Sequence, residues 1–397
     1  MNKAEALLMK EKKYLLGNYA RPDDFIPVKG KGSYLFDING KKYLDFVAGI
    51  AVNALGHQHP AVLKALSTQA KKFLHVSNLY HNGLDADAAE VLVENTCADR
   101  AFFCNSGTEA NEAAIKFARR YCIRKCGKEK FEIITFNNAF HGRTYGALSA
   151  TPQAKYQEDF GPMLGGFKYV DFNDAAALEK AFSANTCAVM MEFLQGEGGG
   201  YSASKDFVNT IAELCKKYNA LLIADEVQCG LGRTGLFMSH QEYDVKPDII
   251  TLAKPIGLGL PLGSVLMTEA IASEIKPGDH GTTFGGNPAA LAITQVILGK
   301  VADKKFLAGV RKKGALLMKL LSNVKSDQIA GVRGKGLWVC VEMKDKAGDI
   351  INALRKNGLL TVKAGAQCIR FLPPLNVSES EIKAAVKIFE KTLTQGL

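Results

Sequence analysis

The sequence predicts an α/β fold whose large domain is built on a mainly parallel, seven-stranded sheet. Short apolar runs rich in β-branched and aromatic residues recur through the middle of the chain. Runs of this length favour buried strands over helices. Segments with helical periodicity follow most of them, which indicates βα units. The expected strands are Ala101–Cys104, Phe131–Phe136, Phe167–Val170, Cys187–Phe193, Ala220–Ala224, Asp248–Ala253 and Leu262–Thr268.

Strand-like segments also lie near both ends of the chain. Tyr34–Asp37 is followed by Lys42–Phe46, and Leu337–Glu342 is followed by Gln367–Phe371. They predict a smaller α+β domain assembled from the two termini. The first sixteen residues are too polar for a signal peptide and predict a short amphipathic helix.

The composition of the chain limits the classes of function that the protein can have. The chain has 397 residues, of which 47% are hydrophobic and 23% charged, as in globular proteins. Since no apolar run approaches the roughly 18 residues that span a bilayer, we expect a cytoplasmic protein with no membrane contact. The formal charge is +10, but the basic residues are spread thinly and do not alternate with aromatics. This pattern disfavours a nucleic-acid partner and suits small anionic substrates.

The nine cysteines are scattered and include no CxxC pair. Such usage is typical of a reducing compartment. Cys122 and Cys126 stand one helical turn apart, but a second pair of ligands is missing. We therefore expect no metal and interpret these two cysteines as helix packing.

Three groups at the ends of expected strands carry the chemistry. The first is Ser106-Gly107-Thr108, directly after the strand that ends at Cys104. Ser106 followed by Glu109 predicts a capping box at a helix start. The free N–H groups and the dipole there favour an anion such as phosphate. An ordinary helix cap is the alternative interpretation.

The second group is Asp225, which follows five apolar residues. An unpaired carboxylate at the mouth of a buried strand is costly, so it needs a cation or N–H donors. A protonated pyridine nitrogen would satisfy it, and so would a structural ion pair.

The third group is Lys254, which ends the run Asp248–Ala253 and precedes a Pro-Gly turn. Desolvation lowers the pKa of a lysine and makes its neutral amine a nucleophile. Lys254 lies 29 residues after Asp225, about the length of one strand–crossover–strand unit. The two residues are therefore expected at neighbouring strand ends.

An anion site, a carboxylate for a ring nitrogen and an amine for an aldehyde are together what pyridoxal 5′-phosphate (PLP) requires. At these residues the sequence resembles class III (subgroup II) aminotransferases of fold type I. The resemblance runs from Val28–Gly32 to Arg370–Leu375. It is closest to the members that act on N2-acetylornithine, particularly at Gly49–His57. The family's organisation implies an N-terminal arm and part of the small domain in residues 1–55, a PLP-binding domain in 56–289 and a C-terminal small domain in 290–397.

The resemblance implies a role for each cofactor-binding residue. Lys254 would hold the cofactor covalently and carry the proton, and Asp225 would pair with the ring nitrogen. The remaining cofactor contacts would come from Ser106, Gly107, Thr108, Phe140, Val227 and Gln228, and from Thr283 reaching the partner subunit's cofactor. This implies a homodimer with shared active sites.

For substrates, the resemblance implies that Arg143 and Arg370 bind carboxylates, with Thr282 nearby. Glu197 would neutralise Arg370 while the amine donor reacts, and would then swing away so that 2-oxoglutarate can bind. A small residue at Gly49, where ornithine-specific relatives carry tyrosine, favours an acylated donor. The sequence departs from the family at Glu192-Phe193-Leu194, where Glu-Pro is usual.

The implied reaction is a ping-pong transamination. N2-acetylornithine gives its terminal amine and becomes N-acetyl-L-glutamate 5-semialdehyde, and 2-oxoglutarate takes the amine and leaves as glutamate. This is a step of arginine biosynthesis, and the resemblance also admits N-succinyl-diaminopimelate transamination in lysine biosynthesis. Ornithine, 4-aminobutyrate and other ω-amines stay open as alternative donors.

A rival function comes from the glycine-rich segment Gly230–Gly235. It invites a dinucleotide-binding interpretation and an oxidoreductase function. The segment follows a strand only loosely, and a lone Gly-x-Gly is weak evidence.

Overall fold

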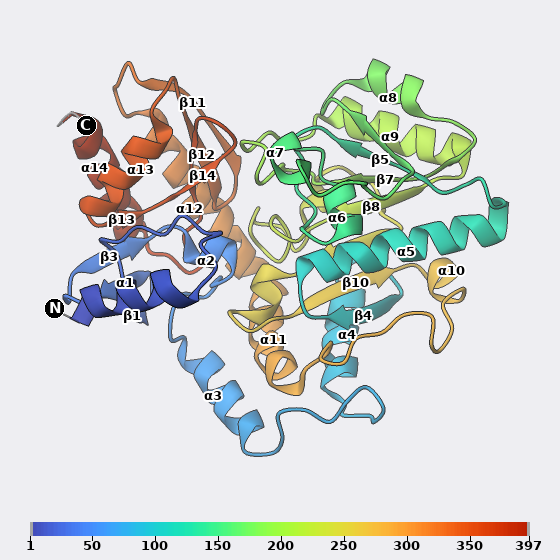
Figure 1. Cartoon of the computed structure of the whole chain (residues 1–397), viewed down its shortest axis with the longest axis horizontal. Coiled ribbons are helices and arrows are strands. Elements are labelled where there is room, and N and C mark those ends of the chain that lie inside the picture. Colours follow the sequence, from blue (N-terminus) through green and yellow to red (C-terminus); the bar gives the residue numbers. More distant parts are fainter. Residues whose placement is uncertain (1–2, 395–397) are drawn as a thin grey trace.

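A seven-stranded sheet forms the centre of the computed structural model, which describes residues 3–394. Strand β10 is antiparallel to its two neighbours, and the other neighbouring pairs are parallel. The predicted class, a mainly parallel sheet of seven strands, is therefore confirmed. In spatial order the strands are β4 (Arg100–Cys104), β10 (Gly263–Met267), β9 (Ile249–Leu252), β8 (Leu221–Asp225), β7 (Thr186–Met191), β5 (Glu132–Phe136) and β6 (Phe167–Val170) (Figure 1).

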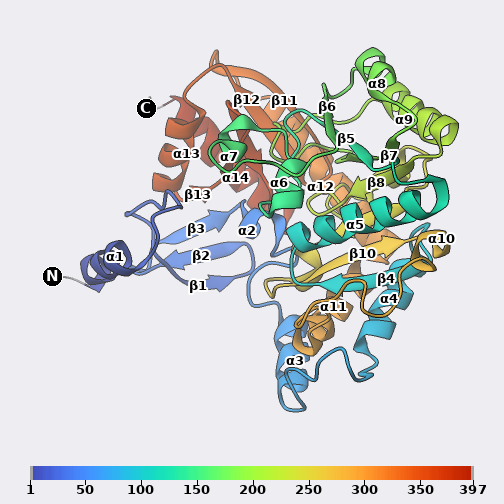
Figure 2. The same cartoon turned by 45° about the vertical axis from the view of Figure 1, so that its right-hand side comes forward.

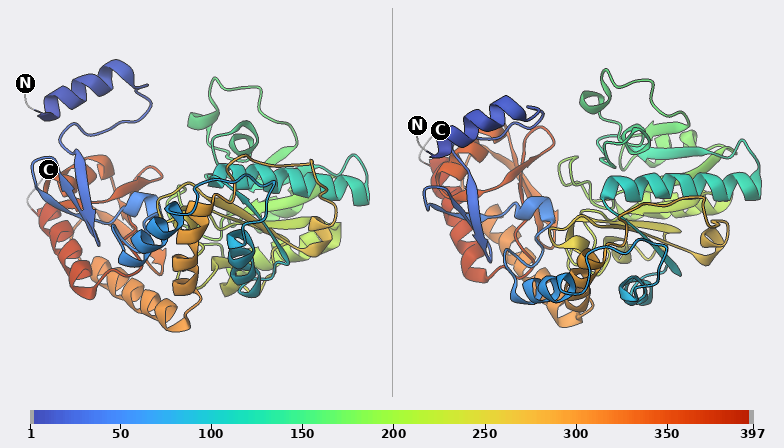
Figure 3. Two further views of the ribbon diagram at one scale, coloured as in Figure 1. Left: turned by 90° about the horizontal axis from the view of Figure 1, so that it is seen from below. Right: turned by 60° about the horizontal axis from the view of Figure 1, so that its bottom comes forward.

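Side chains alternate along the strands and contribute to two hydrophobic layers, one on each face of the sheet. In β8, Leu221 and Ile223 pack with α5 (Gly107–Cys126) on one face of the sheet. The intervening Leu222 packs with α9 (Lys205–Tyr218) on the other face. Because successive side chains of a strand point to opposite faces, a strand covered on both sides is apolar throughout. The long helix α5 lies along this first face of the sheet (Figure 3).

Shorter helices lie around this sheet or, in the case of α2, beside the N-terminal strands (Figure 1), and α11 packs against α3 and α4. These elements are α2 (Ala48–Ala51), α3 (Pro60–Ala70), α4 (Leu84–Glu94), α6 (Tyr145–Ser149), α7 (Ala154–Gln157), α8 (Ala175–Ala181), α10 (Glu269–Ala272), α11 (Pro288–Val301) and the 3-10 helices η1 (Ser239–Glu242) and η2 (Lys254–Gly257).

A smaller unit is assembled from both ends of the chain, as predicted (Figure 2). The C-terminal β13 (Leu359–Leu360) pairs in parallel with the N-terminal β3 (Lys42–Asp45). This pairing joins the termini in one sheet. The sheet of β13 also contains β1 (Pro27–Lys31) and β2 (Tyr34–Asp37), and a second sheet has the order β11 (Ile329–Lys335), β12 (Trp338–Met343), β15 (Cys368–Phe371) and β14 (Val362–Ala364).

Four helices belong to the same end of the molecule: α1 (Lys3–Tyr14), α12 (Lys304–Ser322), α13 (Ala347–Lys356) and α14 (Glu379–Thr394). The predicted N-terminal helix is α1, and none of its residues is buried; residues 1–2 lie outside the described part. The expected domain boundaries at residues 55 and 289 stay a prediction. Across residues 3–394, the helices are all too short or too polar to span a bilayer.

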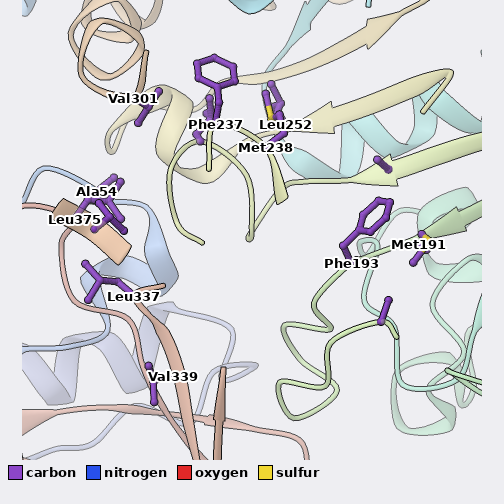
Figure 4. Close-up of a cluster of buried hydrophobic side chains, with 14 of the residues drawn as sticks. Ala54, Met191, Phe193, Phe237, Met238, Leu252, Val301, Leu337, Val339 and Leu375 are labelled. Atoms are coloured by element: carbon purple, nitrogen blue, oxygen red, sulfur yellow. The ribbon is translucent and has the colours of Figure 1, made fainter. Parts of the chain in front are cut away.

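The hydrophobic core continues from the central sheet into the smaller unit. Figure 4 shows Met191 and Leu252 of the sheet, together with Leu337 and Leu375 of the C-terminal part. The glycine-rich segment Gly230–Gly235 lies at this junction.

That segment is packed by its own chain. A side-chain carbon added to Gly232 would meet Val301 at 2.9 Å and Leu375 at 3.2 Å. Arg233 is fully buried and donates hydrogen bonds to the carbonyls of Leu337 and Pro373, at 3.0 and 2.6 Å. Close internal packing, rather than a dinucleotide, accounts for these glycines.

Candidate active site

A cavity of about 410 Å³ opens where β4, β8 and β9 end. Ligands of open α/β sheets gather at such strand ends. Ten residues that the sequence singled out line it: Ser106, Gly107, Thr108, Phe140, Arg143, Glu197, Asp225, Val227, Gln228 and Lys254.

Lys254 follows β9 and begins the 3-10 helix η2. Its φ is +45°, a left-handed conformation that is strained for a residue with a side chain. Burial lowers the pKa of its amine, against the opposing effect of Asp225. Within residues 3–394 no hydrogen bond or ion pair reaches Nζ. The structure thus presents a desolvated, unpaired amine to the cavity, as expected from sequence.

Asp225 is 3% exposed and is held by three donors. Its Oδ1 accepts from the Val227 N–H at 3.0 Å. Its Oδ2 accepts from Asn111 Nδ2 at 2.9 Å and lies 2.7 Å from His141 Nδ1. These contacts orient the carboxylate at the cavity wall. The strands of Asp225 and Lys254 are parallel neighbours, as predicted.

Sequence reasoning missed both side-chain partners of Asp225. Asn111 is a fully buried polar residue among the alanines of α5, a pattern that signals a specific hydrogen bond. His141 directly follows Phe140, and nothing in the local sequence joins it to β8. Within the described residues, Asn111 Oδ1 and His141 Nε2 are buried without a partner.

The start of α5 forms one rim of the cavity. Ser106 Oγ accepts from the Glu109 N–H at 3.2 Å, which confirms the predicted helix cap. The reciprocal bond differs from a capping box, because Glu109 Oε2 accepts from the N–H of Asn105 instead of Ser106. The first-turn N–H groups of Gly107 and Thr108 precede the internal hydrogen bonds of the helix and remain available to an anion.

Gly107 and Thr108 are also packed against neighbouring loops. A side-chain carbon on Gly107 would lie 2.8 Å from Val227, so this close approach requires glycine. Thr108 Oγ1 accepts from the N–H groups of Arg143 and Thr144, at 3.2 and 3.4 Å. The hydroxyl therefore anchors the loop that carries Arg143.

Arg143 is exposed and stacks on aromatic rings. Its guanidinium lies 3.7 Å from the ring centre of Tyr156, which meets Phe140 edge to face at 5.8 Å. No carboxylate of residues 3–394 pairs with Arg143. This leaves a fixed guanidinium available for a substrate carboxylate.

Arg370 behaves differently because it is fully buried behind Glu197. Its Nη2 donates to Glu197 Oε1 at 2.8 Å, and its Nη1 donates to Gln228 Oε1 at 2.7 Å. The same Gln228 oxygen accepts from Trp338 Nε1. Gln228 thus positions Arg370, a role that the sequence did not suggest.

Glu192 ties two loops of the site together. Its Oε2 accepts from the Phe140 N–H at 3.2 Å and its Oε1 from the Gly196 N–H at 3.1 Å. Burial raises the pKa of this carboxyl to about 7. Phe193, where the resemblance led us to expect proline, fills the core beside Tyr243 at 5.2 Å between ring centres.

The structure does not bring Thr282 and Thr283 to this cavity. Thr282 Oγ1 accepts from Asn105 Nδ2 at 2.7 Å and lines a separate hollow, and Thr283 is exposed. Gly49 has a φ of +66°, so a tyrosine there would be strained. Val52, three residues on, lines the cavity instead.

Comparison with known proteins agrees with this geometry. The profile of the family "Aminotransferase class-III" matches residues 18–393. The acetylornithine aminotransferase of Methanocaldococcus jannaschii is 46% identical over 97% of each chain. The acetylornithine/succinyldiaminopimelate aminotransferase of Buchnera aphidicola is 45% identical over 95% of each. The Toxoplasma gondii ornithine aminotransferase, whose crystals show partial occupancy of PLP, superposes with a TM-score of 0.93 at 33% identity, over 98% of this chain and 94% of its own. The chain belongs to the class-III aminotransferase family.

Proposed function

We propose that this enzyme uses PLP to transfer the terminal amine of N2-acetylornithine to 2-oxoglutarate, as in arginine biosynthesis. One observation carries the proposal: the unpaired amine of Lys254 and the oriented carboxylate of Asp225 share a cavity with an anion-binding helix start. The names of the relatives support the donor, and the Buchnera relative supports N-succinyl-diaminopimelate as a further donor.

The donor set fits PLP. The N–H groups at Gly107 and Thr108 suit its phosphate, Phe140 and Val227 offer apolar contact to its ring, and Asp225 suits a protonated ring nitrogen. When bound, PLP supplies an aldehyde that captures amines and a ring that withdraws electrons.

The residues of the chain supply binding and proton transfer. Lys254 Nζ, whose pKa is lowered by burial, removes the proton from the amine-bearing carbon of the substrate. Arg143 binds the carboxylate distant from the reacting carbon. Glu197 pairs with Arg370 while a donor reacts that has no carboxylate next to its reacting carbon. Glu197 then releases Arg370, which binds the α-carboxylate of 2-oxoglutarate.

Two measurements test this function. Borohydride reduction of PLP-loaded enzyme should attach the cofactor to the peptide containing Lys254, and Lys254→Ala should abolish that attachment. With 2-oxoglutarate fixed, kcat/KM for N2-acetylornithine should exceed that for ornithine and for 4-aminobutyrate. A higher value for free ornithine would show that the donor is wrong.

We also propose a homodimer in which Thr283 contributes to the partner's site. Exposed apolar side chains cluster around Thr282 and Thr283: Leu79 is 83% exposed and Phe284 61%. Asn78 donates to the carbonyls of Thr282 and Gly285, which joins the two segments into one surface. Such patches mark interfaces. Analytical ultracentrifugation should give a dimer, and a monomer at micromolar concentration would contradict this.

A further inference from the structure

The loop that carries Glu197 is rich in glycine yet is firmly attached to the C-terminal sheet. Gly196, Gly198, Gly199 and Gly200 surround the glutamate. Glycine loses more conformational freedom than any other residue when it is fixed, so this order must come from contacts outside the loop.

Three N–H donors of the C-terminal sheet bind three carbonyls of the loop, and the Cys368 thiol adds a longer contact of 3.6 Å to one of these, the carbonyl of Gly199. Arg370 Nη1 donates to the carbonyl of Gly196 at 2.8 Å, and the N–H of Gly365 donates to that of Glu197 at 2.8 Å. The third bond runs from Arg333 Nε to the carbonyl of Gly199 at 2.7 Å. Among residues 3–394, by contrast, Arg370 alone binds the side chain of Glu197.

Arg333 is itself fixed by the surrounding side chains. Its Nη1 donates to Glu342 Oε2 at 2.6 Å, and its Nη2 donates to Cys368 Sγ at 2.9 Å. Its guanidinium lies 4.0 Å from the ring centre of Tyr201, at the far end of the loop. A planar group with donors on three nitrogens makes all these contacts at once, which a lysine ammonium cannot reproduce.

The pairing of Glu197 with Arg370 depends on this attachment. If the loop backbone shifted, the carboxylate would lose its place over Arg370. Of the three donors, Arg370 binds substrate in the proposed function and Gly365 acts through its backbone. Arg333 is the donor whose removal loosens the loop without altering a group that faces the cavity.

We propose that Arg333 is a positioning residue for donor selection. This role rests on the proposed function. Arg333 fixes the backbone of Gly196–Gly200, so that Glu197 covers and releases Arg370 by side-chain rotation alone. Without Arg333, Arg370 would be left open to α-amino acids such as glutamate, whose α-carboxylate lies next to the reacting amine.

The test compares Arg333→Gln and Arg333→Lys with the matched control Lys335→Gln. Lys335 lies two residues further along β11 and pairs with Glu242 at 2.7 Å, away from the loop. In single-turnover donor half-reactions of the PLP-loaded enzyme, the ratio of kcat/KM for N2-acetylornithine to that for glutamate should fall about tenfold in Arg333→Gln, as expected for loss of a charge-assisted hydrogen bond. It should fall less in Arg333→Lys and remain unchanged in the control. A general loss of stability would lower both rates together and leave the ratio unchanged.

Hydrogen exchange provides a readout independent of activity. The N–H of Gly196 is bound to Glu192 and that of Gly200 to the carbonyl of Gln195. Both amides should exchange faster in Arg333→Gln than in the parent or in Lys335→Gln. An unchanged donor ratio or unchanged exchange in folded Arg333→Gln would overturn the proposal. If the parent transaminated no amine, the proposed function would fail instead, and the exchange comparison would decide the role of Arg333.

Discussion

Glu197 Oε1 lies 2.8 Å from Arg370 Nη2, and this contact joins a loop of the large sheet to a strand of the C-terminal sheet. The arginine side chain is 1% exposed and the glutamate 25%. The more exposed partner can therefore leave into solvent, while Arg370 keeps its bonds to Gln228 and Gly196. If the pair opens in catalysis, as proposed, we therefore expect the acid and not the base to move.

Glu197→Gln should change donor choice. Removing the charge weakens a partly buried, charge-assisted hydrogen bond and leaves Arg370 more open. We expect kcat/KM for glutamate as donor to rise about tenfold, the size of such a bond, while that for N2-acetylornithine does not rise. Half-reaction rates with each amine measure this, and a fall in both would contradict the masking role.

Asp225→Asn should remove the charge beside the cofactor ring while keeping the hydrogen bond from the Val227 N–H. Because an amide does not stabilise a protonated ring nitrogen, turnover should fall at least about a hundredfold. Cofactor attachment to Lys254, measured by borohydride reduction and peptide mapping, should persist. Turnover within threefold of the parent would show that Asp225 is not the partner of the ring nitrogen.

Tyr156→Leu should raise KM for substrates with a distal carboxylate about fivefold at unchanged kcat, because the stack that holds Arg143 is lost. Tyr156→Phe keeps the ring and serves as the matched control. Pyruvate, which lacks a distal carboxylate, should react equally well with parent and variant. A rise in KM for pyruvate of the same size would refute the stacking role.

Glu192 makes stability depend on pH. Its pKa is raised by burial from 4.5 to about 7, so the folded protein binds a proton that the unfolded chain releases. The stabilisation is complete below pH 4.5 and is lost as pH rises through 7, with an upper bound on the order of 3 kcal/mol.

Glu192→Gln should therefore make the free energy of unfolding less dependent on pH between pH 5 and pH 8. Denaturant unfolding of parent and variant at both values measures the difference. An identical pH dependence in the two proteins would show that Glu192 does not titrate in this range.

Some site residues could be predicted from local sequence, and others depend on distant partners. Lys254 and Asp225 were predictable because each ends a run of apolar residues, and a buried strand brings its last residue to the sheet edge. His141, Asn111 and Arg333 were not, because their partners lie 84, 114 and 134 residues away. Thr282 and Thr283 carry a family pattern, yet the single chain holds them outside the cavity.

The sequence by itself determined the alternation of strands and helices, the helix cap at Ser106 and the positions of the amine and the carboxylate at strand ends, since these depend on periodicity and neighbouring residues. Only the tertiary structure decided which donors orient Asp225, which arginine is masked and what fixes the loop of Glu197. These depend on hydrogen bonds a few ångströms long between distant segments, and such distances are set by packing of the whole chain rather than by local pattern.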